Sequence, residues 1–231
     1  MITRQVSLWD VDDTTEFGSV ADMTVGPVEQ FDVREFCRRW HYTKYLGVGA
    51  ANWPYGLFDG PTLVGVVAYN LPSVTAAGAV FGAEHAVRVA HMTRLACAED
   101  APRNSESRLI GGSLRMLSED KPSMWAVVTY AARDVGHVGY VYQATNAIYT
   151  GISSAKPYYI DRQGRRRGAT NSDGPGGPAR IKMAAQAGGW TLHASPGKHR
   201  YVYILGTPAE RRARRKLLKL PSLPYPKDGA R

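Results

Sequence analysis

The stretch that decides the fold is WPYGLFDGPTLVGVVAY, which runs from Trp53 to Tyr69. It contains two apolar runs, residues 53–58 and 63–69, joined at Asp59-Gly60. An Asp-Gly pair between two such runs is a strong hairpin signal, because both residues tolerate the positive backbone angles of a tight turn. The sequence therefore predicts an antiparallel hairpin, and the other elements are placed around it.

Helical and strand patterns flank this hairpin on both sides. Residues 33–45 have apolar residues at helical spacing, with Asp32 as the expected N-cap, and residues 72–83 resemble a loop. Gly111-Gly112 lie inside a second helical pattern, where each costs about 1 kcal/mol relative to alanine and indicates close packing. The remaining predictions are strands at 87–95, 125–130, 148–150 and 200–205, and helices at 105–119 and 137–144. This order predicts an α/β fold with a mixed central sheet flanked by helices.

Positive charge is concentrated in the last third of the chain. Residues 1–155 contain 12 Lys+Arg and 16 Asp+Glu, a net of −4, whereas residues 156–231 contain 17 and 4, a net of +13. Such clustering favours a polyanion partner, because each neutralised phosphate releases condensed counterions; a solvated basic tail is the alternative. The clustered residues are Arg162, Arg165, Arg166 and Arg167 in a first run, and Arg211, Arg212, Arg214, Arg215 and Lys216 in a second.

Length and composition limit the class of protein. A chain of 231 residues with 44% hydrophobic residues can bury a sizeable core and is not disordered. Cys37 and Cys97 alone cannot build a disulfide scaffold or a structural zinc site, and no apolar run approaches the roughly 20 residues of a membrane span. We expect a cytoplasmic protein without membrane contact. Its expected parts are a polar lead (1–30), a central domain (31–206) with a basic loop at 161–180, and a basic proline-rich tail (207–231).

Standard catalytic signatures are absent from the sequence. It has no glycine-rich phosphate loop ending in Lys-Ser/Thr, no GxGxxG fingerprint, no HExxH and no GxSxG. The Asp/Asn-Pro-Pro-aromatic tetrapeptide of adenine amino-methyltransferases is also missing. Candidate chemistry lies instead where polar residues follow predicted core elements, the place at which open α/β sheets bind ligands.

Five polar residues at such ends are candidates. Arg94 ends a buried strand, where a guanidinium needs a carboxylate or phosphate partner. Ser105 and Ser107 lie in the first turn of a helix, whose N–H groups can hold an anion; simple capping would also explain Ser105. Tyr142 and Gln143 offer a phenol and an amide to a base edge, or they pack in the core.

Several blocks of sequence, taken together and in order, carry a family resemblance. The most specific is VYQATNAIYTG (141–151) next to GHVG (136–139). The other blocks are His41-Tyr42, the strand 63–69, Thr93-Arg94-Leu95, residues 103–108, Tyr130-Ala131, and residues 198–203. In this order they resemble the Mom family of phage DNA-modification proteins.

The resemblance implies a GNAT-like acyltransferase fold with a basic C-terminal extension, and a reaction. Adenine in duplex DNA would be converted to an N6-carbamoylmethyl-type base, which protects phage DNA from host restriction. Acetyl-CoA or a related acyl donor is implied as cofactor, and iron as a further one. Residue by residue, the resemblance implies catalytic roles for Tyr69, Arg94, Ser107 and Tyr142, donor contacts from Arg103, Ser105, Ser107 and Arg108, and DNA contacts from His41 and Tyr42.

Two positions depart from the family pattern. An acidic residue usually follows the Tyr-Ala pair, but here Ala132 follows it, with Asp134 as the candidate replacement base. An inactivated form of a chain that carried aspartate at 132 is the alternative. The GNAT pyrophosphate turn, Gln/Arg-x-x-Gly-x-Gly/Ala, has no counterpart, because no glycine lies between Arg103 and Gly111.

The leading hypothesis is a DNA adenine-modifying transferase whose arginine runs hold the duplex by its phosphates. Because adenine N6 lies inside the base stack, we expect the target base to be flipped out. One rival is an acyltransferase acting on a small-molecule or protein amine, which does not need the basic third. The other is a non-catalytic DNA-binding protein, which Ala132 would suit.

Overall fold

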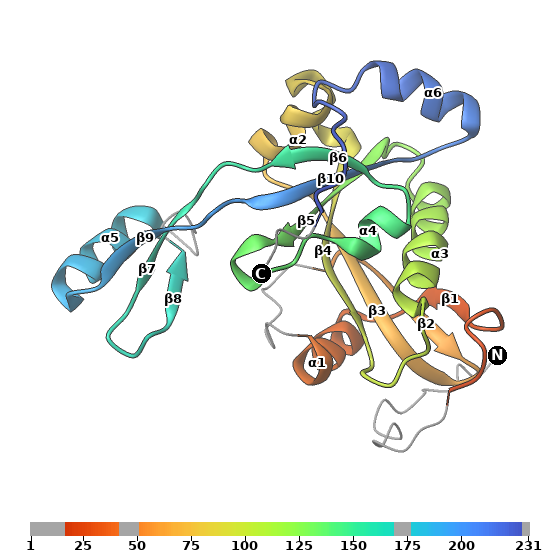
Figure 1. Ribbon diagram of the computed structural model, residues 1–231, viewed down its shortest axis with the longest axis horizontal. Coiled ribbons are helices and arrows are strands. Elements are labelled where there is room, and N and C mark those ends of the chain that lie inside the picture. Colours follow the sequence, from red (N-terminus) through yellow and green to blue (C-terminus); the bar gives the residue numbers. More distant parts are fainter. Residues whose placement is uncertain (1–16, 42–50, 169–176, 228–231) are drawn as a thin grey trace.

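The computed structural model describes residues 17–41, 51–168 and 177–227, and structural statements below concern these residues. A seven-stranded sheet has the order β1-β2-β3-β4-β5-β10-β6 (Figure 1). Its strands are β1 (Thr24–Pro27), β2 (Trp53–Asp59), β3 (Thr62–Asn70), β4 (Val89–Cys97), β5 (Ala126–Ala132), β6 (Ile148–Ile152) and β10 (Lys198–Ile204). This mixed sheet, flanked by helices, is the architecture that the resemblance implied.

The sheet has a gap between two neighbouring strands, β4 and β5. β4 and β5 are the parallel pair, and they are paired only from Val89 to His91 on β4 and from Ala126 to Val128 on β5. Both strands continue beyond this point, β4 along β3 and β5 along β10. The two strands therefore diverge, and the space between them needs another occupant.

Helices cover both faces of the sheet. α1 (Gln30–Trp40) packs on one face with alternate residues of β3, among them Val66 and Ala68. α3 (Ser105–Asp120) packs on the other face with Val64 and Val67. The other helices of the central body are α2 (Val74–Phe81), α4 (Tyr140–Ala144) and α6 (Pro208–Lys216), with the 3-10 turns η2 (Ala83–Arg88) and η3 (Arg133–Val135).

The glycine pair in α3 has the expected role at one position. A Cβ atom on Gly112 would lie 2.5 Å from a methyl group of Val25 on β1. The absence of a side chain therefore lets α3 approach the edge strand, which confirms the close packing that the pair indicated. Gly111 has nothing within 4 Å of such an atom and faces open space.

A small second sheet projects from the connection between β6 and β10. Its order is β8-β7-β9, and the helix α5 precedes β9. We call the described parts of residues 153–197 the arm; in Figure 1 it extends to the left of the central sheet. Its elements are β7 (Pro157–Ile160), β8 (Arg166–Gly168), α5 (Gly177–Gly188) and β9 (Thr191–Ala194).

The chain after α6 returns across the body. The backbone N–H of Leu223 donates to the carbonyl of Tyr149 on β6, 2.9 Å away, and the Tyr225 hydroxyl donates to the carbonyl of Ala147, also 2.9 Å. Leu218 and Leu220 pack against a buried cluster that includes Phe81. Residues 217–227 are therefore part of the packed fold and cover the outer edge of β6.

The structure departs from the sequence predictions at four places. Residues 24–27 form β1 and so belong to the sheet, not to a polar lead. α1 begins at Gln30 because Glu29 and Asp32 form a capping box, with Asp32 at N3 instead of the N-cap. Helix α2 lies where a loop was expected, and its N-cap Ser73 accepts from the N–H of Ala76. The described residues of the expected loop 161–180 belong to the arm, where they form β8 and the start of α5.

The hairpin and the other predicted strands and helices are confirmed within a few residues at each end that the structure describes. The last residues of the helix predicted at 33–45 lie outside the described residues. Within the described ranges, every helix is too short or too polar to cross a bilayer.

Candidate functional site

A cavity of about 470 Å³ lies where β4 and β5 diverge; we call it the β4–β5 pocket. One side is formed by β4 and the other by the end of β5. The loop 136–139 and the first residues of α4 close it, and Glu106 of α3 and Lys198 of β10 line its rim. Because these segments come from five elements of the core, the pocket has fixed walls.

The pocket brings together three residues that the sequence singled out. Arg94 comes from β4, Tyr142 from α4 and His41 from the end of α1. The NH1 group of Arg94 donates to the carbonyl of Thr93, 2.6 Å away, and the Tyr142 ring lies 5.4 Å from that of Tyr201. A cation and an aromatic ring thus share one cavity.

The helix that carries Tyr142 is held by its neighbour. The Nε2 group of Gln143 donates to the Tyr201 hydroxyl at 3.1 Å, and that hydroxyl in turn donates to the carbonyl of Val138. Gln143 also reaches the carbonyl of Pro226 at 3.4 Å, so the chain end contacts α4. These contacts favour the packing role for Gln143.

Three predicted catalytic residues lie elsewhere. Tyr69 is fully buried and its hydroxyl pairs with that of Ser113 at 2.7 Å; burial raises its pKa, so it remains a neutral packing residue beneath the pocket. Ser107 faces a separate hollow of about 330 Å³ beside Val25. Asp134 is exposed on η3 and is not a lining residue, whereas Ala132 is.

Two of the predicted donor-binding residues form hydrogen bonds with backbone carbonyls of the protein itself. The Ser105 hydroxyl is buried and donates to the carbonyl of Pro102 at 2.7 Å. The guanidinium of Arg108 donates to the carbonyl of Met23 at 2.9 Å and so ties α3 to the N-terminal segment. Arg103 is exposed just before the helix, and Ser107 lies in its first turn.

One wall of the pocket is an uncovered strand edge. Beyond His91, β5 no longer covers the edge of β4, so an amide-bearing chain can lie along that edge as an added strand would. The lining mixes apolar residues such as Met92 and Val141 with polar ones. Glu106, in the first turn of α3, lines the pocket, and the N–H groups of a first helical turn favour a phosphate.

The thiol in the pocket is not a nucleophile. Burial raises the pKa of Cys97 far above neutrality, so its thiol stays protonated at pH 7. Burial also raises the pKa of Cys37, to about 11. A covalent acyl-cysteine step is therefore disfavoured, since the thiolate is the reactive form.

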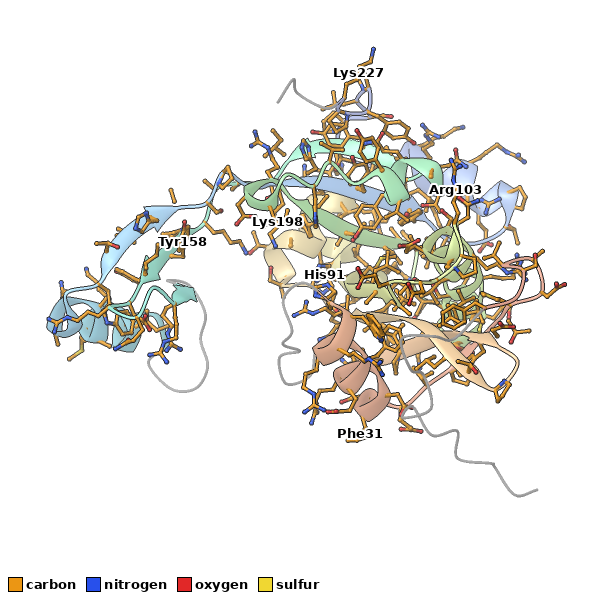
Figure 2. All side chains as sticks on the ribbon, turned by 60° about the horizontal axis from the view of Figure 1, so that its bottom comes forward. Phe31, His91, Arg103, Tyr158, Lys198 and Lys227 are labelled. Atoms are coloured by element: carbon orange, nitrogen blue, oxygen red, sulfur yellow. The ribbon has the colours of Figure 1, made fainter. Side chains whose placement is uncertain are left out.

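Positive charge gathers where the arm joins the pocket. Burial, followed by the charges of Lys198, Arg94 and Lys156, lowers the pKa of His91 to about 4. His91 is therefore neutral at pH 7, and the cations around it carry the local charge. Figure 2 shows Lys198 at the root of the arm, on the side of the core where His91 also lies.

Two arginines of the arm are paired with a carboxylate. Arg165 and Arg167 both donate to the buried carboxylate of Asp161, at 2.8 and 3.2 Å. Burial raises the pKa of Asp161, but these hydrogen bonds and those from the N–H groups of Arg165 and Gln163 lower it to about 2. Arg162 is exposed, and Arg166 lies in β8.

The second basic run forms helix α6 at the opposite end of β10. Arg211, Arg212 and Arg215 line a hollow of about 960 Å³ there. Arg214 points inward, donating to the carbonyl of Leu205 at 2.8 Å and to Glu210 at 2.7 Å, and Lys216 is exposed. Lys198, at the start of β10, lines the β4–β5 pocket, whereas Ile204, at its end, lines the hollow beside α6.

No iron site emerges from the residues that the structure describes. Within them, no group of three or more His, Cys, Asp or Glu side chains lies close enough together to hold a metal ion. Tyr42, predicted to contact DNA, lies outside the described residues.

Sequence reasoning missed several lining residues, namely Glu106, Lys198, Tyr130, His137 and Tyr140. Tyr130, His137 and Lys198 stand inside the blocks that carried the resemblance, and so does Glu106, within residues 103–108, so that signal was available. The sequence could not show the rotation of α3, which decides that Glu106, and not Ser107, faces the pocket.

The chain was compared with solved structures and with known sequences. Among solved structures, the chain aligns over 80% of its length with Ard1 from Thermoplasma volcanium (99% of that chain, 13% identity, TM-score 0.47). It aligns equally far with the ribosomal-protein-S18-alanine N-acetyltransferase from Escherichia coli (95% of that chain, 9% identity, TM-score 0.45). At these scores the likeness says nothing about substrate or ligand.

The sequence comparisons go further. The chain is 29% identical over 195 residues to the methylcarbamoylase Mom of Escherichia phage Mu, which covers 84% of this chain and 77% of that protein. The model of the Mom protein family matches residues 22–227, which include every element that forms the β4–β5 pocket. With nearly the whole fold inside that match, the chain belongs to the Mom protein family.

Proposed function

We propose that this chain is a DNA-modifying transferase that adds a carbamoylmethyl-type group to N6 of adenine in duplex DNA. Its membership of the Mom family carries the proposal, together with the 29% identity to the methylcarbamoylase of phage Mu. Transfer forms a bond between N6 and a carbon of the donor, releases the N6 proton and expels the donor's leaving group. A modified adenine would protect phage DNA from host restriction.

The β4–β5 pocket is the proposed reaction site. Arg94 would stabilise negative charge that develops on the donor, as a fixed cation in a water-poor cavity does. Tyr142 would stack on the extruded adenine. The position after the Tyr-Ala pair, Ala132, lines the same pocket, so an acid there would lie within reach of the N6 proton.

An acyl-CoA or a related acyl donor is the proposed cofactor. When bound, an acyl-CoA would give its acyl group to N6 and lose the CoA thiol. A carbamoylmethyl product would need a related donor that has its leaving group on the carbon next to an amide, and that carbon would bond to N6 as the leaving group departs. The uncovered edge of β4 would hold the amide-bearing chain of the donor. Ser107, with the N–H groups at the start of α3, would hold the donor's phosphates. Arg103 would add a charge at the entrance.

The arm is the proposed duplex contact. It projects from the end of the sheet at which the pocket lies, and it carries exposed cations such as Arg162 and Lys182. DNA held there by its phosphates would present a flipped adenine to Arg94 and Tyr142. The arginines of α6, a strand's length away, would contribute less.

Nucleoside mass spectrometry tests the proposal. Plasmid DNA from cells that express the chain should contain a heavier deoxyadenosine, and Ala132→Asp should increase its amount. Arg94→Ala should abolish the product without abolishing duplex binding. An unchanged adenine peak with both the original chain and Ala132→Asp would contradict the proposal.

A non-catalytic DNA-binding protein is the second candidate. The observation that favours it is Ala132, which lines the pocket at the position where the family usually has an acid. Asp134 does not replace that acid, because it is exposed outside the pocket, and the carboxylate that does line the pocket, Glu106, comes from α3. On this reading the chain binds duplexes, Ala132→Asp yields no product, and Arg94→Ala has no phenotype. The same mass measurement separates the two functions.

A further inference from the structure

Two large apolar side chains are exposed on the loop that closes the β4–β5 pocket. Val135, at the end of η3, is 52% exposed, and Tyr140, at the start of α4, is 58% exposed. The residues between them, 136–139, line the pocket, as does Tyr140 itself. Apolar side chains exposed beside a cavity commonly mark a contact with a ligand or a macromolecule.

The loop is held in place from beneath. The Arg133 guanidinium donates to the carbonyl of Pro196 at the root of the arm, 2.5 Å away, and the N–H of His137 donates to the carbonyl of Ala132 at 3.0 Å. Gly139 has a φ of +84°, and a Cβ atom there would lie 2.7 Å from the ring of Tyr201. A loop so fixed presents Val135 and Tyr140 outward without the freedom to fold them away.

Three cations lie on the same side of the pocket as this apolar pair, and one exposed acid, Asp134, directly precedes Val135. Arg133 precedes it, and Lys198 and Lys156 lie exposed where the arm meets the core. The influence of both lysines on His91 places them at the same end of the pocket. Apolar side chains flanked by phosphate-binding charges are typical of proteins that insert a wedge between base pairs.

We propose that Val135 and Tyr140 form a wedge that enters the base stack and fills the gap left by the flipped adenine. The inference rests on the proposed function, because it requires a duplex from which one adenine enters the β4–β5 pocket. Extrusion costs a few kcal/mol of stacking and pairing, and side chains in the gap offset part of that cost and prevent the base from returning. The wedge and the pocket are adjacent parts of one loop, which suits a single extrusion step.

Duplexes with 2-aminopurine in place of one central adenine, in a series of flanking sequences, provide the test, since this base fluoresces when it leaves the stack. The original chain should raise the fluorescence on binding. Val135→Ala/Tyr140→Ala should lower that rise about tenfold, the equivalent of about 1.4 kcal/mol in the extrusion equilibrium. Duplex affinity, measured by anisotropy, should change by less than about threefold, because phosphate contacts dominate it.

Matched variants separate a wedge from a general loss of structure. Val87→Ala removes the same atoms from a side chain that is 75% exposed on η2, and it should leave the fluorescence rise intact. Val135→Leu and Tyr140→Phe keep apolar bulk and should retain the rise. The double alanine variant should regain the fluorescence rise on a duplex with an abasic site opposite the 2-aminopurine, because extrusion costs less there.

The outcomes distinguish the wedge from the function on which it rests. If the original chain modifies plasmid adenine and the double alanine variant gives the same fluorescence rise and the same product, the wedge is overturned and the proposed function stands. If the original chain makes no modified adenine, the proposed function fails. If the variant loses duplex binding in parallel with fluorescence, the two residues act as an ordinary binding surface and the wedge is again overturned.

Discussion

Arg94 and Tyr142 share a pocket because β4 and α4 flank the place where β4 and β5 separate. The sequence indicated both, Arg94 by its place at the end of an apolar strand and Tyr142 by its block. Ser107 and Tyr69 could not be placed in the same way. One residue along a helix turns the side chain by about 100°, so Glu106 faces the pocket and Ser107 does not. A register shift between Ala68 and Tyr69 similarly decides which face of β3 each residue takes.

His91 gives a prediction at this scale. Burial and the nearby cations lower its pKa to about 4, so between about pH 6.5 and pH 4 the unfolded chain binds a proton that the folded protein excludes. Stability should therefore be full above pH 6.5 and fall as the pH drops towards 4, by about 3 kcal/mol for this residue.

Urea unfolding at pH 7, 5.5 and 4.5 measures the effect. His91→Gln should flatten the pH dependence, whereas His193→Gln, on the exposed strand β9, should not. His199, whose pKa burial also lowers, supplies the residual slope. An unchanged slope in His91→Gln would contradict this account.

At the scale of elements, the two basic runs differ in what holds them. The sequence identified both as polyanion contacts but could not place them, because their distance depends on the length and direction of β10. The arm adjoins the pocket, whereas α6 lies at the other end of that strand. Arg165, Arg167 and Arg214 are also tied to carboxylates, so fewer charges are available than the sequence suggests.

Paired charge removals compare the two elements. Arg162→Gln/Lys182→Gln on the arm should weaken duplex binding severalfold and reduce the dependence of log Kd on log salt by about one to two. Arg211→Gln/Arg212→Gln on α6 removes the same charge and should have the smaller effect. Titrations at several salt concentrations measure both, and a larger loss from the α6 pair would place the duplex at the opposite end of the sheet.

At the scale of the whole molecule, residues 24–27 and 217–227, which the sequence analysis assigned to a lead and a tail, pack on the central sheet. β1 extends the sheet at one edge and residues 217–227 cover the other. The mixed sheet followed from the alternation of apolar runs and helical patterns. The chain ends did not, because segments such as TVGP and LPSLPYP have no periodicity and acquire structure only by docking on an existing edge.

Removal of the chain from Leu217 onward tests this integration. The truncated protein should lose about 2–4 kcal/mol of unfolding free energy, because Leu218 and Leu220 leave a buried cluster and the edge of β6 is uncovered. Urea unfolding measures the loss. Leu218→Ala should reproduce part of the loss, whereas Lys216→Gln, just before the cut, should not. If the truncated protein kept the urea midpoint of the full chain, residues 217–227 would not contribute to the stability of the fold.

The contact between Pro226 and Gln143 has a practical consequence for handling this protein. An affinity tag fused to the C-terminal segment would follow, along the chain, a residue that contacts the helix that carries Tyr142. Such a tag is expected to disturb this contact and lower turnover while purification and solubility look normal. Recombinant material for enzymology should therefore have its tag removed, or should be compared with an untagged preparation before inactivity is attributed to the polypeptide.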